Sequence, residues 1–271
     1  MPAEEHVKTR PTLRERRRAA ATQEILDAAE RHIVENGPAA LSMRAVARDL
    51  GMTVQGLYHY FPSWSDLVTA LIAKAYDDTA DAMEAAVDAA ARADLTRADP
   101  AVRADPAART EPAPPRVLVA AEEYRRWAVT HPERFQLLYG TPLRQYAAPA
   151  GGPTTQAMIR ISAVFQREMF GGFTRAQLEA ADAPELSPAL RAHLEQLPAH
   201  GLGALPPPAT TLLLSAWGHL HGLVVLEVFG HTAFLGEHQA EIFRRGVRNL
   251  VDDVHRRIPG AGPGATGPSG P

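Results

Sequence analysis

The stretch from Leu41 to Phe61 reads LSMRAVARDLGMTVQGLYHYF, and it decides the fold. Its small residues stand where two short helices joined by a tight turn need them. Ala47 lets the second helix cross closely over the first, and Gly51 makes the turn at a position where a side chain would clash. Leu57 fills the small core between the two helices. The spacing of these residues predicts a helix-turn-helix.

The residues of the second helix favour contact with DNA. Thr53 is predicted to cap this helix and to leave its first turn free to enter a major groove. Tyr58, His59 and Tyr60 place polar aromatic groups on a short helix whose surface would ordinarily hold lysine and glutamate. Such groups suit contacts with phosphates and base edges. Any small helical hairpin could share the alanine, glycine and leucine spacing, so the flanking residues carry the functional inference.

A basic segment leads into the first predicted helix, which spans 12–36 and ends at an Asn-Gly-Pro stop signal. Between Lys8 and Arg18, six basic residues oppose one acidic residue, which gives a local charge of +5. The whole chain has a net charge of −3 and a pI near 6.4, so a nucleic-acid footprint must be local. Residues 1–11 are expected to form a disordered basic arm.

The rest of the chain also reads as helices, and no run of alternating β-branched residues is long enough to predict a strand. The expected fold class is therefore all-α. A long helix should begin after Ser63 or Ser65, either of which can act as an N-cap, and fade near Ala93. The prolines of 94–115 predict a flexible loop. Further helices are expected at 117–130, 133–139, 154–170, 187–197, 209–229 and 237–257.

The helix-turn-helix stretch resembles the signature of the TetR family of transcriptional regulators. From Ser42 to Leu67 the chain reads SMRAVARDLGMTVQGLYHYFPSWSDL, which matches the family's pattern closely together with the upstream helix. The resemblance implies that the second helix reads base edges, that its tyrosines hold phosphates and that an arginine reaches in from the preceding helix. The residues so implied are Arg44, Thr53, Val54, Gln55, Gly56, Tyr58, His59 and Tyr60.

Three residues depart from the family's pattern. Trp64 stands where the family usually has a lysine, and Val54 and Gln55 replace common small or basic residues. One phosphate contact of the family is therefore in question. Trp64 could instead pack on the adjacent helices or against the sugar-phosphate backbone, and the arginines of 14–18 could supply the missing charge.

The second half of the chain matches the family more sparsely. The HPERF string at 131–135, Trp217 and the His-Gly pair at 221–222 resemble a TetR subclass named for a W-H-G pattern. The resemblance implies a helix-turn-helix domain at 12–75 and a helical regulatory and dimerisation domain at 76–258. The glycine- and proline-rich composition of 259–271 predicts a disordered tail.

The last two predicted helices are apolar enough to form an interface between two copies of the chain. Two stripes stand at helical spacing, and two such helix pairs would form a four-helix bundle. The alternative is that both stripes are buried within one copy. The stripes consist of Leu213, Leu220, Val224 and Val228 on one helix and of Ile242, Val247, Leu250 and Val254 on the other.

A set of aromatic residues could line a small-molecule pocket, because such pockets are mostly apolar with a few polar groups. The alternative is that these residues are simply core. The set consists of Tyr124, Trp127, Phe135, Tyr139, Phe165, Trp217 and the polar His221. The resemblance favours a pocket in this domain and leaves the effector unidentified.

Composition and motifs argue against several other classes. The chain has no cysteine, which excludes disulfides and thiolate metal sites, and it contains no HExxH, GxSxG, GxGxxG or P-loop string. His219 and His221 point about 200° apart on a helix, so they cannot chelate one metal ion. No apolar run approaches the roughly 20 residues of a membrane span. We therefore expect a cytoplasmic protein without cofactor or metal, and not an enzyme.

These observations together predict a regulator that binds duplex DNA. The expected form is a homodimeric repressor that holds a palindromic operator and is released by a small-molecule effector. A DNA-binding activator without ligand release would use the same helix-turn-helix, so it stays open as the alternative.

Overall fold

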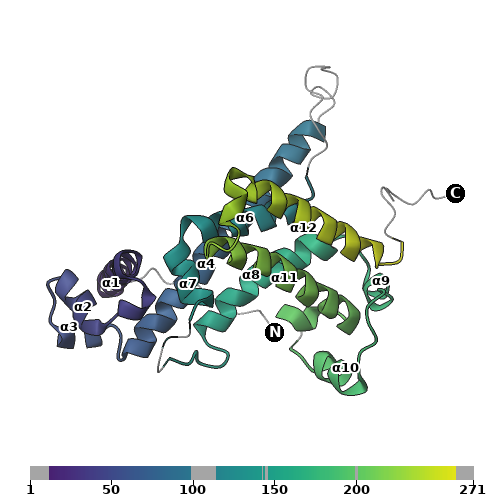
Figure 1. The fold of residues 1–271 in the computed structure, drawn as a ribbon. Coiled ribbons are helices and arrows are strands. Elements are labelled where there is room, and N and C mark those ends of the chain that lie inside the picture. Colours follow the sequence, from purple (N-terminus) through teal and green to yellow (C-terminus); the bar gives the residue numbers. More distant parts are fainter. Residues whose placement is uncertain (1–11, 99–113, 142, 144–145, 199–200, 261–271) are drawn as a thin grey trace. The chain divides into compact units, whose positions relative to one another are not determined.

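The structure is a computed structural model that describes residues 12–98, 114–141, 143, 146–198 and 201–260 (Figure 1). Among these residues every regular element is helical and none is a strand, which confirms the all-α fold class. The chain divides into two compact units, one formed by the residues up to Ala75 together with 133–154, the other by 76–132 and the residues from Thr155 on. The arm at 1–11 lies outside the described residues.

The first unit contains the predicted helix-turn-helix. Its elements are α1 (Leu13–Asn36), α2 (Met43–Asp49), α3 (Val54–Tyr58), the first part of α4 (Trp64–Ala98) and most of α7 (Pro132–Tyr139). Side chains of Ile33, Val46, Leu57 and Leu67 are completely buried in its core. Residues 133–154, which the sequence placed in the regulatory domain, group with this unit instead.

Side-chain caps fix where the helices of this unit begin. Thr12 and Glu15 form a reciprocal capping box at the start of α1. The hydroxyls of Ser42 and Thr53 accept hydrogen bonds from Ala45 N and Gly56 N at the starts of α2 and α3. Ser63, rather than Ser65, accepts from the backbone N–H of the third residue of α4. The observed helix starts of this unit therefore agree with the predicted starts to within about two residues.

Gly51 is required in the turn for a different reason from the one expected. A Cβ added to it would meet no atom within 4 Å, so no clash excludes a side chain. Its φ of +63° lies in the left-handed region, which is strained for residues with a side chain. The backbone conformation of the turn, and not the available space, demands glycine there.

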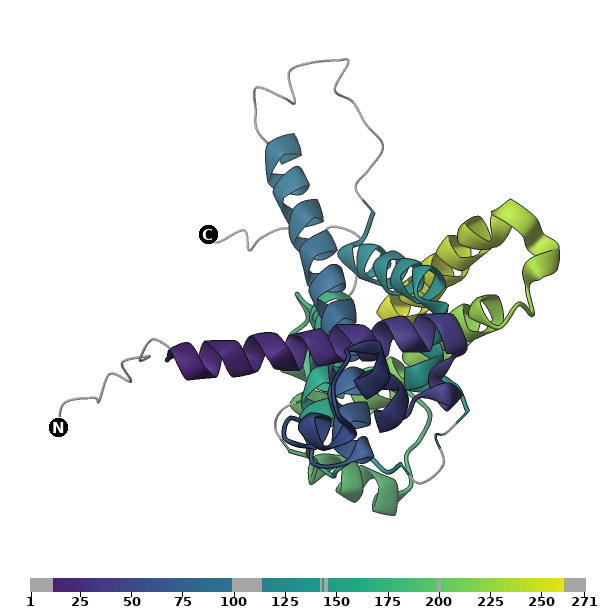
Figure 2. The same ribbon diagram turned by 90° about the vertical axis from the view of Figure 1, so that its left-hand side faces the viewer.

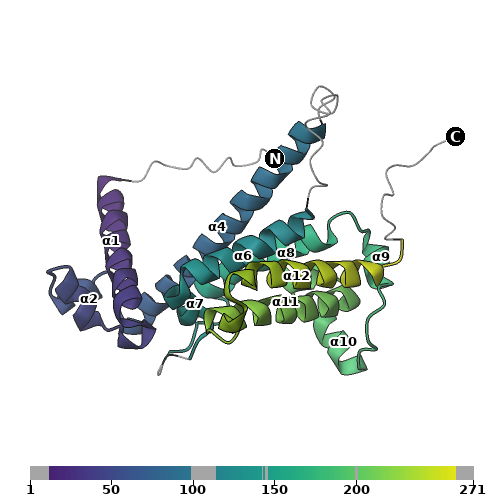
Figure 3. The ribbon, with the colours of Figure 1, turned by 45° about the horizontal axis from the view of Figure 1, so that its top comes forward.

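The second unit is a helical domain centred on a hairpin. Its elements are the rest of α4, α6 (Arg116–Thr130), most of α8 (Pro153–Phe170), α9 (Arg175–Glu179), α10 (Pro188–Glu195), α11 (Pro207–Val228) and α12 (Gln239–Arg256). The hairpin helices α11 and α12 lie side by side and both pack against α6 (Figures 1 and 3). The short 3-10 turn Ala233–His238 joins them.

Some boundaries in this unit differ from the sequence-based expectation. Helix α4 continues to Ala98, and Asp94 pairs with both Arg97 and Arg116, so the predicted loop at 94–115 is wrong for its first five residues. Positions 99–113 of that loop lie outside the described residues. The short α9, held by a Thr174–Gln177 capping box, was not expected. Of the predicted tail, Pro259 is anchored because its carbonyl accepts from Gln177 Nε2 at 3.0 Å.

Helix α11 is apolar on more than one face. Among the described residues it is the one helix long and apolar enough to cross a membrane by length and composition, which corrects the expectation that no such run exists. Part of that apolar surface is core, since Leu213, Leu220 and Val224 are buried within this chain. The core helix of a globular domain can be as apolar as a membrane-spanning helix, because it too is covered on several faces.

Candidate functional site

The surface formed by α3 is the first candidate site. This helix has five residues, too few to be stable alone. It packs against α2, and Leu57 is its one buried residue. The Thr53 hydroxyl accepts from Gly56 N at 3.0 Å. A Cβ at Gly56 would stand 3.2 Å from that hydroxyl, so glycine fits the close cap. The first turn of α3 therefore keeps a tight cap and an outer face open to solvent.

The residues predicted to contact DNA are brought to this surface. Thr53, Gln55, Tyr58 and His59 are exposed, whereas Val54, Gly56 and Tyr60 are half-buried. Arg44 is exposed on α2, which packs against α3. The described residues contain no group of three or more acidic or histidine side chains that could hold a metal ion.

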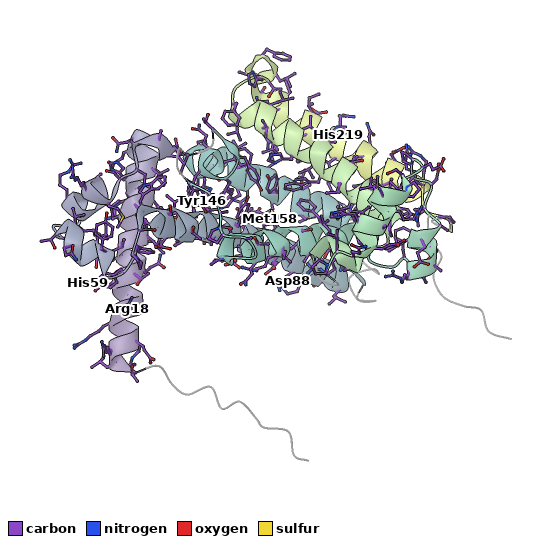
Figure 4. All side chains as sticks on the ribbon, turned by 90° about the horizontal axis from the view of Figure 1, so that it is seen from below. Arg18, His59, Asp88, Tyr146, Met158 and His219 are labelled. Carbon is purple, nitrogen blue, oxygen red and sulfur yellow. The ribbon has the colours of Figure 1, made fainter. Side chains whose placement is uncertain are left out.

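The sequence did not predict the contact of Arg18 with the carboxyl end of α3. Its Nη2 donates to the carbonyl oxygen of His59 at 3.1 Å, and its guanidinium lies 5.7 Å from the centre of the Tyr60 ring. Figure 4 labels both Arg18 and His59 on this unit. A cation over an aromatic face is attracted to the ring's electrons. Arg18 thus ties the carboxyl end of α3 to α1 across 41 positions of sequence, a distance at which no local pattern signals a contact.

A groove runs beside α3. It has a volume of about 490 Å³ and opens to solvent between the amino-terminal part of α1 and α3. One wall carries three arginines, and the other carries polar and aromatic residues of the helix-turn-helix. The lining residues are Arg14, Arg17, Arg18, Met52, Gly56, His59 and Tyr60.

Trp64 takes the first of its two expected placements, because it packs on neighbouring elements. Its Nε1 donates to the carbonyl oxygen of Leu41 at 3.1 Å, and its ring meets the Tyr146 ring edge-on at 6.4 Å. The Tyr146 and Thr69 hydroxyls lie 3.2 Å apart. Trp64 therefore joins the start of α4 to the residue that precedes α2 and to the segment after α7.

The second candidate site lies between helices of the second unit. Four of the seven predicted pocket residues are in contact. The Tyr124 hydroxyl lies 2.8 Å from His221 Nδ1, and Trp217 stacks on His221 with ring centres 5.2 Å apart. Phe165 meets Trp217 at 5.5 Å. Of the other three, Trp127 stacks on His131, and Phe135 lies against Tyr139 in the first unit.

An apolar cavity adjoins these rings. Its volume is about 20 Å³, enough for one water-sized molecule. A drug-sized ligand needs several hundred cubic ångströms, so entry of such a molecule would require the surrounding helices to separate. Aliphatic side chains line most of the wall, and the aromatic residues of the sequence alone do not point to them. The lining residues are Val117, Phe165, Met169, Leu213, Ala216, Trp217, Leu220, Val247 and Leu250.

Burial lowers the pKa of His221 below its usual value of 6.5. The folded state therefore favours the neutral ring, whose Nδ1 can accept a hydrogen bond from the Tyr124 hydroxyl. Because the unfolded chain binds the proton more readily, this contribution to stability is complete above about pH 6.5 and is lost as the pH falls through the lower folded pKa.

We expect the free energy of unfolding of the wild type to fall more steeply between about pH 7.5 and about pH 5.5 than that of His221→Gln. Denaturant titrations at one fixed protein concentration measure the difference. Equal slopes for the two proteins would show that His221 is not held neutral by the fold. His219→Gln, an exposed neighbour on the same helix, should keep the wild-type slope.

The predicted interface stripes are largely buried within one copy. Leu213, Leu220, Val224, Val247 and Val254 belong to the core of this chain, which is the alternative that the sequence left open for them. Part of the hairpin surface stays uncovered, and large apolar side chains, one of them from a predicted stripe, stand exposed on it. These are Leu214, Leu226, Phe229 and Ile242.

Family models match both halves of the chain. Residues 25–71 match the model of bacterial regulatory proteins of the tetR family, and residues 117–250 match the tetracyclin repressor-like C-terminal domain. The HTH-type transcriptional regulators Rv1816 of Mycobacterium tuberculosis and Mb1846 of Mycobacterium bovis are each 30% identical over 206 residues, which is 76% of this chain and 80% of theirs.

Solved structures have the same architecture. The crystal structure of the protein SCO4313 superposes with a TM-score of 0.63 at 29% identity and covers 89% of this chain and 100% of that one. A protein of unknown function from Rhodococcus sp. RHA1 gives 0.55 at 19% identity, with coverage of 92% and 99%, and supports the fold alone.

Proposed function

Because the chain belongs to the TetR family of bacterial transcriptional regulators, we propose that it is a repressor that binds a palindromic operator as a homodimer and is released by a small-molecule effector. The family consists of regulators and not of enzymes. The observation that carries the proposal is the open face of α3, where a capped first turn and two tyrosines stand on a rigid core. We place its action in the cytoplasm, where the operator lies.

On DNA, the first turn of α3 enters the major groove and its residues read base edges. Tyr58 and Tyr60 donate hydroxyl hydrogen bonds to phosphates on either side. Arg44, exposed on α2, takes a guanine edge with two parallel hydrogen bonds, for which a guanidinium has the right geometry.

The uncovered face of the α11–α12 hairpin supports the dimer. Isolated exposed apolar residues are ordinary, but two exposed leucines on a long apolar helix, together with Phe229 at its end and Ile242 on α12, mark an interaction surface. Gly218 and Gly222 lie one turn apart on α11, and a Cβ at either would meet nothing within 4 Å. Another helix can therefore approach closely there. A second copy related by twofold symmetry would present the same face and complete a four-helix bundle.

The ring cluster of Tyr124, Phe165, Trp217 and His221 supports the effector site. An effector that enters beside it must enlarge the small cavity, and the displaced helices then change the spacing of the two recognition helices in the dimer. Affinity for the operator falls because the two half-sites can no longer be docked together.

The experiment measures binding of the purified protein to fragments of the DNA that flanks its own gene, at two salt concentrations. We expect sequence-selective binding that Arg44→Ala weakens about 10- to 100-fold, which corresponds to about 1–3 kcal/mol. Tyr58→Phe, which removes one hydroxyl, should weaken it to a lesser degree. Arg191→Ala removes an exposed arginine of α10 in the other unit and serves as the control.

Two outcomes would count against the proposal. Weak binding that salt abolishes and that ignores sequence, equal in all variants, would contradict the recognition surface. Selective binding that no compound in an effector screen changes would keep the regulator and remove the ligand-released switch, as expected for the activator.

A further inference from the structure

The first turns of α1 extend beyond the core of their unit. Residues 12–20 are exposed on every side, and burial begins only at Ala21 and Thr22 and is complete at Ile25. Figures 2 and 3 show this part of α1 reaching past α2. Packing cannot account for a helix that continues here. The Thr12–Glu15 capping box keeps these turns helical without help from the core.

The exposed turns present one cationic face. Arg14, Arg17 and Arg18 stand three and four positions apart, so they share a face of the helix, and all three line the groove beside α3. Arg16 is rotated by about 200° from Arg14 and does not line the groove. In the sequence these arginines form one basic segment, whereas the helix places Arg16 on a different face from the other three.

The three arginines of the groove are not equivalent. Arg18 is engaged, because it holds the His59 carbonyl oxygen and the Tyr60 ring. Within the described residues, the side chains of Arg14 and Arg17 make no hydrogen bond or ion pair, and both are exposed. The nearby Glu15 is held in the cap instead, where its Oε2 accepts hydrogen bonds from the Thr12 backbone N–H and hydroxyl, which lower its pKa.

We propose that Arg14 and Arg17 bind phosphates of the operator backbone outside the base pairs that α3 reads, and that Arg18 is a positioning residue that fixes the end of α3. The inference rests on the proposed function. The opposite wall of the groove includes Gly56 of α3 and the residues His59 and Tyr60 at its carboxyl end, so a DNA strand held against α3 continues into the groove. Guanidinium groups suit this backbone because they pair with phosphate oxygens.

The proposed contact involves residues outside the part of the chain that the family model matches. The family model matches from residue 25 onward, so the exposed turns that carry these arginines precede the matched region. The contact also supplies positive charge to the helix-turn-helix domain, in which Trp64 stands in place of the family's usual lysine and donates to the Leu41 carbonyl. The operator footprint should therefore extend beyond what α2 and α3 contact.

The test compares Arg14→Ala, Arg17→Ala and their double variant with Arg16→Ala, which removes the same charge from the other face of the same helix. Operator affinity is measured against salt concentration on two fragments, one with long flanks and one trimmed to the half-sites. Each groove substitution is expected to reduce the slope of log affinity against log salt by about 0.9, and the double variant by about 1.8, on the long fragment. Arg16→Ala should leave the slope unchanged.

On the trimmed fragment the wild type should behave like the double variant, because the phosphates in question are gone. The inference would be overturned if the double variant kept the wild-type slope on the long fragment, or if its slope fell no more than that of Arg16→Ala. Selective binding by the wild type would still uphold the proposed function in that case. A wild type that binds no flanking DNA selectively would overturn both. Circular dichroism confirms that the variants remain folded.

Arg18 is tested separately with Arg18→Lys, which keeps the charge and loses the planar fork. The salt slope is expected to stay as in the wild type, while the ratio of specific to non-specific affinity falls about 10-fold. A purely electrostatic role would leave that ratio unchanged, and this outcome would contradict positioning through His59.

Discussion

Leu226→Asp is expected to convert the dimer into a monomer at micromolar concentration and to weaken operator binding by about 100-fold or more. The side chain is 42% exposed on the uncovered face of α11, so within one copy the aspartate stays solvated and the fold is retained. In the proposed dimer, the same carboxylate would be buried without a partner, at a cost of several kcal/mol. A monomer then engages one half-site and loses the gain that linking two half-sites provides.

The matched control is Leu190→Asp, because Leu190 is 44% exposed on α10 and the change of charge is the same. Sedimentation velocity and operator titration are measured for both variants. If Leu226→Asp sediments as the wild type does, α11 is not the interface. If both variants dissociate, the added charge and not its position on α11 causes the dissociation.

Leu57→Ala should produce the largest loss of stability in the helix-turn-helix. The Leu57 side chain is 0% exposed, and α3 depends on it because five residues cannot sustain a helix on their own. Removal of a buried leucine side chain costs about 2–5 kcal/mol, since apolar contacts are lost and a cavity remains. We expect the free energy of unfolding of this unit to fall by that amount and DNA binding to fail.

Denaturant unfolding followed by fluorescence measures this loss, with Trp64 reporting on the same unit. Tyr58→Ala, at the next position, provides the control because that side chain is exposed. It should leave stability within about 0.5 kcal/mol of the wild type while it weakens DNA binding. A stable Leu57→Ala protein that still binds DNA would contradict the view that this one residue holds the recognition helix in place.

The segment after α6 is where the chain passes back from the second unit to the first. Residues 133–154 lie within the stretch that matches the C-terminal family model, yet they group with the helix-turn-helix. Arg134 and Lys74 both pair with Glu30 of α1, at 3.1 and 3.2 Å. A shift of α7 would therefore act directly on the helix that carries the groove arginines.

The sequence by itself determined the parts of this protein that depend on neighbouring residues. Helix starts follow from caps that act within three positions, as at Thr12, Ser42 and Thr53. Gly37 and Gly51 mark turns because only the local backbone decides their positive φ. Apolar spacing of three and four residues predicted the all-α class in the same way, and the recognition helix followed from these local rules together with its family signature.

The tertiary structure alone decided which residues meet across long stretches of chain. Arg18 reaches His59, Trp64 meets Tyr146, and Tyr124 reaches His221 over separations of 41, 82 and 97 positions. It also decided that the stripe led by Leu213 faces the core while Leu226 stays uncovered. A helix that is apolar on several faces carries no signal for which face its own chain will cover, because that choice depends on how distant helices pack.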